Sequence, residues 1–164
     1  MHLSVFNEVS AVEAAEVLRP CIDVERWITE LVSARPFSSL EQLTESATSS
    51  AKPFNREEIG AALAHHPRIG ERAGGDSQEA TLSRSEQASL NLDAGVLERL
   101  AAANRDYEQR FDRVFLIRAA GRSSEEILAE CQRRLQNTDE AELAEVADQL
   151  RQIALLRLQD AVKN

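Results

Sequence analysis

The chain has 164 residues, of which 43% are hydrophobic and 29% charged, the proportions of an ordinary globular protein. This length is enough to bury one core, and we expect residues 1–164 to form a single domain. The 28 acidic side chains outnumber the 19 basic ones and give a net charge of −9, which argues against nucleic acid or an anionic membrane as a partner.

Almost the whole chain is predicted to be helical. Four Ser-x-x-Glu motifs, beginning at Ser10, Ser38, Ser83 and Ser123, fit the capping box that starts a helix. Each proline disfavours helical geometry in the residue before it and so marks a helix end. The predicted helices cover 10–18, 22–34, 39–48, 55–65, 83–92, 94–111, 112–119, 123–135 and 139–161, with residues 72–81 as the main loop.

These elements predict an all-α fold, a single compact domain of about eight or nine helices. The run 114–117 is the one strand-like stretch, and it is too short for periodicity to distinguish a strand from a buried helix. Cys21 and Cys131 lack metal-ligand spacing, so we expect small buried hydrophobic residues in a reducing compartment. The sequence lacks a secretory signal and an apolar run of the ~20 residues that a membrane span needs, which predicts a cytoplasmic protein.

The last predicted helix carries an arginine on its apolar side. Leu143, Val146, Leu150, Ile153 and Ala154 form a stripe at helical spacing, and Arg157 falls in the middle of it. A guanidinium facing the core is costly unless it is paired. Arg157 therefore either pairs internally or snorkels past the helix end, or it lines a pocket and holds an anionic or urea-like substrate.

The segment His66-Pro67-Arg68-Ile69-Gly70-Glu71 is the best candidate for chemistry. It puts an imidazole that titrates near neutral pH at a predicted helix end, and Glu86 follows in the next helix. His66 could equally be a helix-terminating residue, and Glu86 a capping residue at the third position of its box. A metal site formed by His65, His66 and Glu71 is a weaker alternative, because this spacing matches no familiar zinc pattern.

The same segment, with Ser83-x-x-Glu86-Gln87, resembles the signature of the OHCU decarboxylases, which act on 2-oxo-4-hydroxy-4-carboxy-5-ureidoimidazoline in urate breakdown. Further segments resemble this family in order and cover essentially the full length: Glu25-x-Trp27, Arg35-Pro36-Phe37, Phe115 to Ser123, and Leu156-Arg157-Leu158. The chain departs from the family at Arg118, where many relatives have a small residue or Cys, and at Ala120, where some have Arg.

The resemblance implies an all-α, cofactor-free homodimer that binds a small anionic ureidoimidazoline. His66 would be the central catalytic residue, with Glu86 beside it and Arg157 as a cationic clamp. Arg68 or Arg72 could add local positive charge. The implied substrate-binding residues, with the segment Phe115–Ala119 contributing backbone groups, are Pro67, Ser83, Gln87, Ile117, Ala119 and Arg157.

The implied reaction removes CO2 and leaves an electron pair on a ring carbon, which is delocalised and then protonated on one face to give (S)-allantoin. His66 would take or orient the proton of the ring hydroxyl, and Glu86 would fix the imidazole. Three alternatives stay open: the same fold acting on a related ureide, a non-catalytic helical interaction module, and a metal-dependent hydrolase that uses His65, His66 and Glu71.

Overall fold

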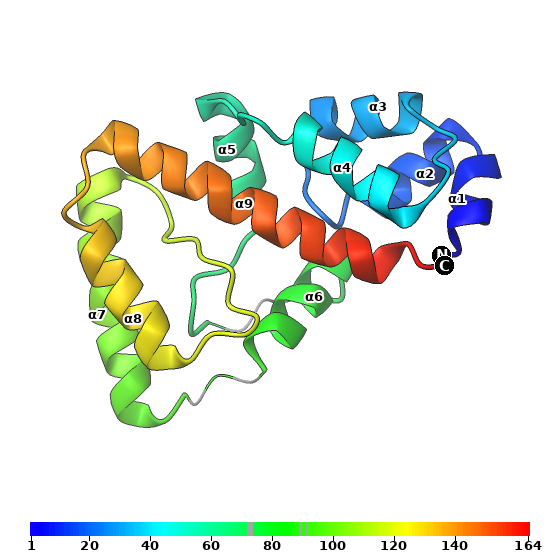
Figure 1. Cartoon of the computed structure of the whole chain (residues 1–164). Coiled ribbons are helices and arrows are strands. Elements are labelled where there is room, and N and C mark those ends of the chain that lie inside the picture. The colour runs from blue at the N-terminus through cyan, green and yellow to red at the C-terminus, as the bar shows by residue number, and fades with distance from the viewer. Residues whose placement is uncertain (72–73, 89, 91) are drawn as a thin grey trace. The chain divides into compact units, whose positions relative to one another are not determined.

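The computed structural model describes residues 1–71, 74–88, 90 and 92–164, and within them it contains nine α-helices and no strand, which confirms the predicted fold class (Figure 1). None of the described helices is long and apolar enough to cross a membrane. The helices are α1 (Leu3–Glu8), α2 (Ala11–Leu18), α3 (Glu25–Ser33), α4 (Leu40–Ser50), α5 (Arg56–Leu63), α6 (Gln78–Gln87), α7 (Ala94–Phe111), α8 (Ser124–Arg134) and α9 (Asp139–Ala161).

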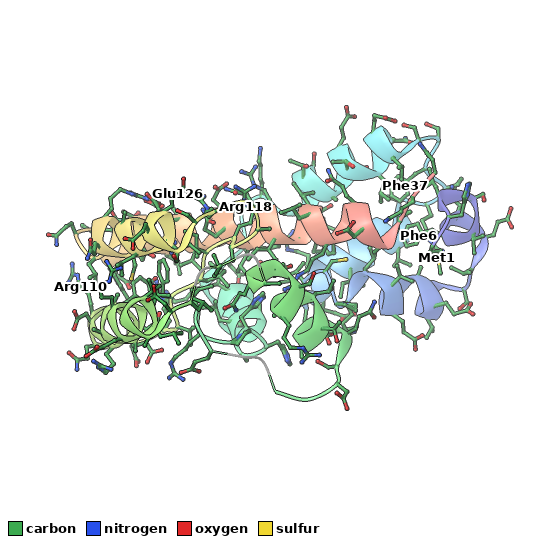
Figure 2. The ribbon with its side chains drawn as sticks, turned by 90° about the horizontal axis from the view of Figure 1, so that it is seen from below. Met1, Phe6, Phe37, Arg110, Arg118 and Glu126 are labelled. Atoms are coloured by element: carbon green, nitrogen blue, oxygen red, sulfur yellow. The ribbon has the colours of Figure 1, made fainter. Side chains whose placement is uncertain are left out.

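The chain divides into two compact units. The first unit consists of residues 1–62 and 150–164, and the second of residues 63–149. Within the first unit, α3 packs against α2 and α4. Its fully buried Trp27 donates from Nε1 to the carbonyl of Ala47 at 2.9 Å, so the largest side chain of the core also ties α3 to α4. Figure 2 shows Phe6 and Phe37 in the same unit, with ring centroids 6.5 Å apart.

Arg26 on α3 organises the start of α5. Its guanidinium binds both carboxylate oxygens of Glu58, at 2.7 and 3.1 Å, and donates to the carbonyl of Ser50 at 2.8 Å. Glu58 also accepts from the backbone N–H of Asn55, whose side chain accepts from the N–H of Glu58, each at 2.9 Å. This reciprocal pair is a capping box that uses Asn in place of Ser.

Glu58→Gln should therefore weaken folding in a pH-dependent way. The hydrogen bond from Arg26 holds the pKa of the Glu58 carboxyl below its usual range. A lowered pKa in the folded state stabilises the fold above the unfolded pKa, and this stabilisation is lost as pH falls through the folded pKa. Because the amide keeps the cap, we expect a loss of about 1 kcal/mol in the free energy of unfolding at pH 7.

The check is urea unfolding of both proteins between pH 7 and pH 3, with Glu57→Gln as the matched control on the same turn. Glu57 is exposed, so its variant should track the wild type apart from a small helix-dipole effect. The difference caused by Glu58→Gln should shrink toward zero below its unfolded pKa. A difference that stays constant across this range would contradict the ion-pair explanation.

In the second unit α7 packs against α8 (Figure 1). The ring of Tyr107 contacts those of Phe111 and Phe115, with centroids 4.8 and 5.1 Å apart, at the centre of an apolar cluster that also contains Ile127 and Cys131. Asp112 ends α7 in the left-handed region, with φ of 53°. The cluster buries the faces of α7 and α8 that turn toward each other.

The predicted helix 112–119 is wrong. After Asp112 the chain runs through 114–119 without helical hydrogen bonds, although Phe115, Leu116 and Ile117 are all buried. A helix would have satisfied the backbone of this apolar run internally. Here a side chain from α8 bonds the carbonyl of Leu116 and one from α9 bonds the N–H of Arg118, which sequence periodicity could not reveal for so short a segment.

Two of the predicted capping boxes lie elsewhere, and the predicted helix 22–34 begins later, at Glu25. The N-cap of α6 is Ser77, which accepts from the N–H of Ala80, so α6 begins within the predicted loop and Ser83 lies inside the helix. The N-cap of α4 is Ser39 and not Ser38. The capping boxes at Ser10 and Ser123 are confirmed, with both reciprocal hydrogen bonds present. Helix α1 was not predicted.

The stripe on α9 is confirmed over most of its length. Val146, Leu150, Ile153 and Ala154 are buried, and Arg157 is only 4% exposed. Toward the start of the helix the fully buried residue is Glu142, whereas Leu143 is half-buried. Thus α9 faces the core with a charged residue near each end.

Both cysteines are buried free thiols, as predicted. Burial raises the pKa of the Cys21 thiol to about 12 and that of Cys131 to about 11. Because the thiolate is the reactive form, neither residue is suited to act as a nucleophile.

Candidate functional site

The His66-Pro67 segment is a loop of the second unit. It directly follows α5, whose residues up to 62 belong to the first unit. The helix ends at Leu63, and the N–H of His66 donates to the carbonyl of Leu63 at 3.1 Å. His66 and Pro67 are half-buried. Gly70 has φ of +89°, a conformation that favours glycine, and it forms a turn directly after the buried residue Ile69.

Two side chains hold this loop from different helices. The Oε1 atom of Gln87, on α6, accepts from the N–H of Gly70 at 3.1 Å. Asn104, a buried residue of α7, donates from Nδ2 to the carbonyl of Ile69 at 3.0 Å. The loop is therefore fixed by specific hydrogen bonds, and Gln87 helps to position it. A contact from Gln87 to a substrate would use its NH2 group, which carries two further donors.

Ser83, Glu86 and Gln87 lie on one face of α6, because residues three and four apart are neighbours on a helix. Ser83 is 4% exposed, and Glu86 is half-buried. Glu86 occupies the last turn of α6, so its predicted capping position is wrong. A carboxylate at the C-terminal end of a helix interacts unfavourably with the helix dipole. Glu86 therefore does not stabilise the end of α6.

The segment 114–119 is anchored along one edge. The guanidinium of Arg134 donates to the carbonyl of Leu116 at 2.8 Å. The N–H of Arg118 donates to Oε1 of Gln149 at 2.9 Å, and the carbonyl of Arg118 accepts from Nε of Arg122 at 3.1 Å. These bonds fall two residues apart, the spacing at which an extended chain presents its polar groups to the same side.

In a trans peptide group the N–H points away from the carbonyl, so the N–H of Ile117 points away from the Leu116 carbonyl and the N–H of Ala119 away from the Arg118 carbonyl. Within the described part of the chain, no protein group bonds the N–H or carbonyl of Ile117 or the N–H of Ala119. Both residues are buried, and they share an apolar cluster with Ile69 of the His66 loop. The second unit thus joins in one core the loop that carries His66 and the predicted backbone-binding segment. The side chain of Arg118 is half-buried, and its Nε finds no partner among the described residues.

Arg157 belongs to the first unit. Its Nη1 atom donates to the carbonyl of Pro20 at 3.1 Å, and its charge opposes the rise in the pKa of the Cys21 thiol. The predicted orientation toward the core is confirmed, and the guanidinium uses a backbone carbonyl there.

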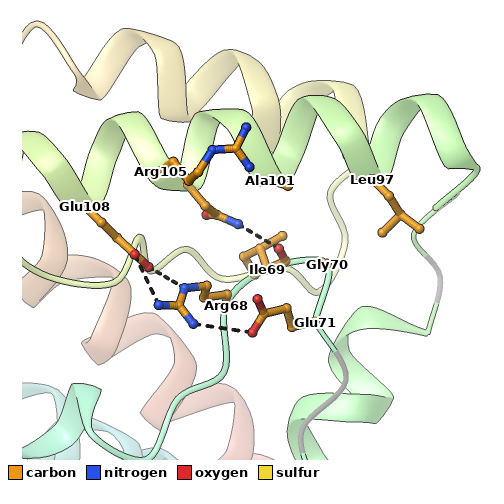
Figure 3. Close-up of a pocket in the computed structure, with 9 residues that line it drawn as sticks. Arg68, Ile69, Gly70, Glu71, Leu97, Ala101, Arg105 and Glu108 are labelled. Atoms are coloured by element: carbon orange, nitrogen blue, oxygen red, sulfur yellow. Dashed lines mark hydrogen bonds and ion pairs between the residues drawn. The ribbon is translucent and has the colours of Figure 1, made fainter.

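Arg68, in the His66 loop of the second unit, is already paired with acidic side chains. A cavity of about 410 Å³ lies between the loop and α7, and Figure 3 shows Arg68 at its edge. Arg68 binds Glu108 at 2.5 Å and Glu71 at 3.6 Å, so its charge is neutralised locally. Arg72 lies outside the described residues.

Metal ligation finds no support in the described ranges. Over 1–71, 74–88, 90 and 92–164, no group of three His, Cys, Asp or Glu side chains is placed to hold a metal ion. His65 is exposed on the turn after α5, and Glu71 is exposed beside Arg68. The predicted alternative of a site formed by His65, His66 and Glu71 therefore has no ligand set in this part of the chain.

The sequence did not predict a buried polar cluster of Tyr107, Arg134 and Glu142, which contacts the 114–119 segment. Arg134 and Glu142 are both fully buried and paired at 2.5 Å, and the hydroxyl of Tyr107 donates to Glu142 at 2.5 Å. A signal was available, because Arg134 follows Ile127 and Cys131 at helical spacing, on the apolar face of α8. The same signal had singled out Arg157.

The structure has a fixed His-Pro loop, a helix face that carries Ser83, Glu86 and Gln87, and a backbone edge that lacks a partner among the described residues. These are the parts of an enzyme for a small polar molecule. The sequence profile of the OHCU decarboxylases matches residues 7–159. The chain belongs to the OHCU decarboxylase family.

Individual relatives agree with this assignment. The chain is 30% identical over 136 residues to the 2-oxo-4-hydroxy-4-carboxy-5-ureidoimidazoline decarboxylase of Haloferax volcanii, covering 80% of this chain and 79% of the relative. It is 31% identical over 134 residues to the protein of the same name from Mus musculus, covering 78% and 74%. A crystal structure of OHCU decarboxylase in the presence of (S)-allantoin matches with a TM-score of 0.70 at 24% identity, over 85% of this chain and 92% of that one, and supports the fold.

Proposed function

We propose that this protein decarboxylates 2-oxo-4-hydroxy-4-carboxy-5-ureidoimidazoline and delivers a proton to one face of the product, giving (S)-allantoin. Membership of the OHCU decarboxylase family supports the reaction. The observation that carries the proposal within the molecule is the backbone edge of Ile117 and Ala119, which lacks a bonding partner in the described ranges and shares a core with the His66 loop.

The backbone edge suits a urea-like group. The N–H of Ile117, its carbonyl and the N–H of Ala119 present a donor, an acceptor and a donor in sequence. A urea carries a carbonyl acceptor flanked by N–H donors, so it can bond to such an edge at more than one point. Buried donors and acceptors left without a partner are costly, and a ligand with these groups would satisfy them.

The proton chemistry is assigned to His66 and Glu86. Loss of CO2 breaks a carbon–carbon bond and leaves the electron pair on the ring carbon, where it is delocalised until a proton arrives. His66 takes or orients the proton of the ring hydroxyl, and Glu86 fixes the imidazole and shares the proton. Ser83 and the NH2 group of Gln87 contribute hydrogen bonds to the substrate, and Pro67 packs against it.

Arg157 is assigned the role of cationic clamp for the substrate carboxylate. Its burial on the apolar stripe supports this assignment, because a guanidinium placed there is costly unless its donors are used. The guanidinium donates to the carbonyl of Pro20, and its planar fork of N–H donors matches the geometry of a carboxylate. When the carboxylate leaves as CO2, its negative charge passes to the ring carbon, and Arg157 no longer holds a carboxylate.

The direct test generates the unstable substrate in place from urate with the two preceding enzymes and follows circular dichroism. With this protein present, one allantoin enantiomer should appear rapidly; without it, decay should be slow and racemic. A folded sample that changes neither the rate nor the optical activity would overturn the proposed reaction. Repeating the assay with related ureides tests the alternative of a different substrate.

Glu86→Gln should keep the fold and lose most of the activity. The substitution changes one charge in the last turn of α6, where a carboxylate opposes the helix dipole, so stability should be unchanged or slightly raised. Removal of a proton-handling group typically lowers kcat by about 100-fold or more. Glu79→Gln on the first turn of the same helix is the control and should retain activity. Near-normal turnover by Glu86→Gln would make Glu86 structural only.

The proposal extends to a cytoplasmic homodimer, as the family resemblance implies. Light scattering coupled to size exclusion should give twice the mass of one chain at micromolar concentration. A mass equal to one chain, in a sample with full activity, would remove the dimer from the proposal without touching the reaction.

A further inference from the structure

The fully buried pair of Arg134 and Glu142 is unusual for its position. Both side chains have no exposed surface, and Arg134 binds Oε1 of Glu142 through two nitrogens, at 2.8 and 2.5 Å. The guanidinium carbon lies 4.7 Å from the ring centroid of Phe115. Tyr107 completes the cluster by donating its hydroxyl to the same carboxylate oxygen.

Stability does not account for this cluster. Removing two charges from water is costly, and replacing a buried ion pair with apolar residues of similar volume is often neutral or stabilising. Apolar residues would fill the space between α7, α8 and α9 equally well. They could not donate to the carbonyl of Leu116, which Arg134 reaches at 2.8 Å.

A second buried side chain anchors the same edge. Gln149, 7% exposed, accepts from the N–H of Arg118 two residues farther along the segment. Two bonds at this spacing fix the rotation of the peptide groups between them. They therefore set the direction in which the N–H and carbonyl of Ile117 point on the opposite edge.

We propose that Arg134, held by Glu142, and Gln149 are positioning residues that orient the backbone edge of Ile117 and Ala119 toward the ureido group of the substrate. This inference rests on the proposed function, since it concerns the same binding edge. The three side chains act through the 114–119 backbone and touch no reacting atom.

The first experiment replaces the cluster as a whole, with Tyr107→Phe, Arg134→Met and Glu142→Leu in one protein. With no charge or hydroxyl stranded, the variant should fold, with a melting temperature lower by only about a few degrees, because the carbonyl of Leu116 and the side-chain amide of Asn137 each lose a partner. KM should rise about 10-fold, the equivalent of one lost hydrogen bond, while kcat changes about 3-fold or less. Arg133→Met is the control, because this neighbour on α8 is half exposed and bonds Glu130 and Glu145 at the surface. The control should keep both constants.

The second experiment compares Gln149→Leu with Gln149→Glu. Leucine removes the acceptor for the N–H of Arg118, and glutamate retains an oxygen at this position. KM should rise about 10-fold for Gln149→Leu and recover to within about 3-fold for Gln149→Glu. This pair of variants tests the positioning role of Gln149 even if the triple replacement does not fold.

Hydrogen exchange separates this inference from the proposed function. In the triple replacement and in Gln149→Leu, the amides of Ile117 and Ala119 should exchange at least about 10-fold faster while the amides of α7 stay protected. Unchanged exchange, or wild-type KM in both folded variants, would overturn the positioning role. If the wild type fails to accelerate the reaction, the proposed function is wrong, and the exchange result still shows whether the side chains orient the edge.

Discussion

His66→Asn should fold like the wild type and lose nearly all decarboxylase activity. Asparagine keeps a polar side chain of comparable reach at the end of α5, and the hydrogen bond from His66 to Leu63 uses only the backbone. The asparagine side chain, unlike the imidazole, has no group that gains or loses a proton near neutral pH. We therefore expect kcat to fall by about 100- to 10,000-fold, the usual contribution of a general acid or base.

The matched control is His65→Asn. His65 precedes His66 directly and is exposed on the same turn, so the pair makes the same chemical change one residue apart. His65→Asn should keep kcat and KM within about 3-fold of the wild type. Stereospecific turnover near the wild-type rate by His66→Asn, measured by circular dichroism, would remove His66 from the mechanism. Loss of activity in both variants would indicate that activity depends on the conformation of the loop and not on the imidazole of His66.

The fold could be predicted wherever helices carry a long apolar period. Residues 94–111 and 139–161 were predicted with the bounds that α7 and α9 have. The start of α6 was displaced because Ser77 and Ser83 both precede residues that can begin a helix, and only packing makes Ser83 an interior position. Capping motifs name candidate starts, and tertiary contacts choose among them.

The segment 114–119 could not be predicted from local sequence. Its apolar residues fit a buried helix as well as an extended chain, and the difference lies in where the backbone bonds. The partners are Arg134 and Gln149, which follow Leu116 and Arg118 by 18 and 31 residues. Such pairings leave no periodic trace in the segment itself.

The candidate site was predicted by two kinds of signal. Resemblance supplied His66, Glu86 and the backbone segment, and periodicity supplied Arg157 as a charge on an apolar face. The same periodicity test applied to α8 would have marked Arg134. The structure was needed to show that Glu86 is not a capping residue, since this depends on which end of α6 the residue occupies. Its catalytic role is part of the proposed function.

Glu142→Leu should destabilise the second unit strongly. It removes the carboxylate that accepts from Arg134 and Tyr107, and it leaves a guanidinium and a hydroxyl with no exposed surface to reach water. Burial and the hydrogen bond to Glu142 raise the pKa of the Tyr107 hydroxyl, so it stays protonated and would be stranded as a donor. Breaking a buried pair in this way costs about 3–5 kcal/mol.

Glu145→Leu is the control for this change, because it removes the same group one turn farther along α9 from the partly exposed pair with Arg133. It should lower the free energy of unfolding by about 1 kcal/mol or less. Adding Tyr107→Phe and Arg134→Met to Glu142→Leu should restore most of the lost stability, since the guanidinium and the hydroxyl are then no longer stranded; the carbonyl of Leu116 and the amide of Asn137 have still each lost a partner. Urea unfolding of the four proteins measures both effects. If the triple replacement is as unstable as Glu142→Leu alone, the cluster stabilises the fold in its own right, and its retention needs no explanation from substrate binding.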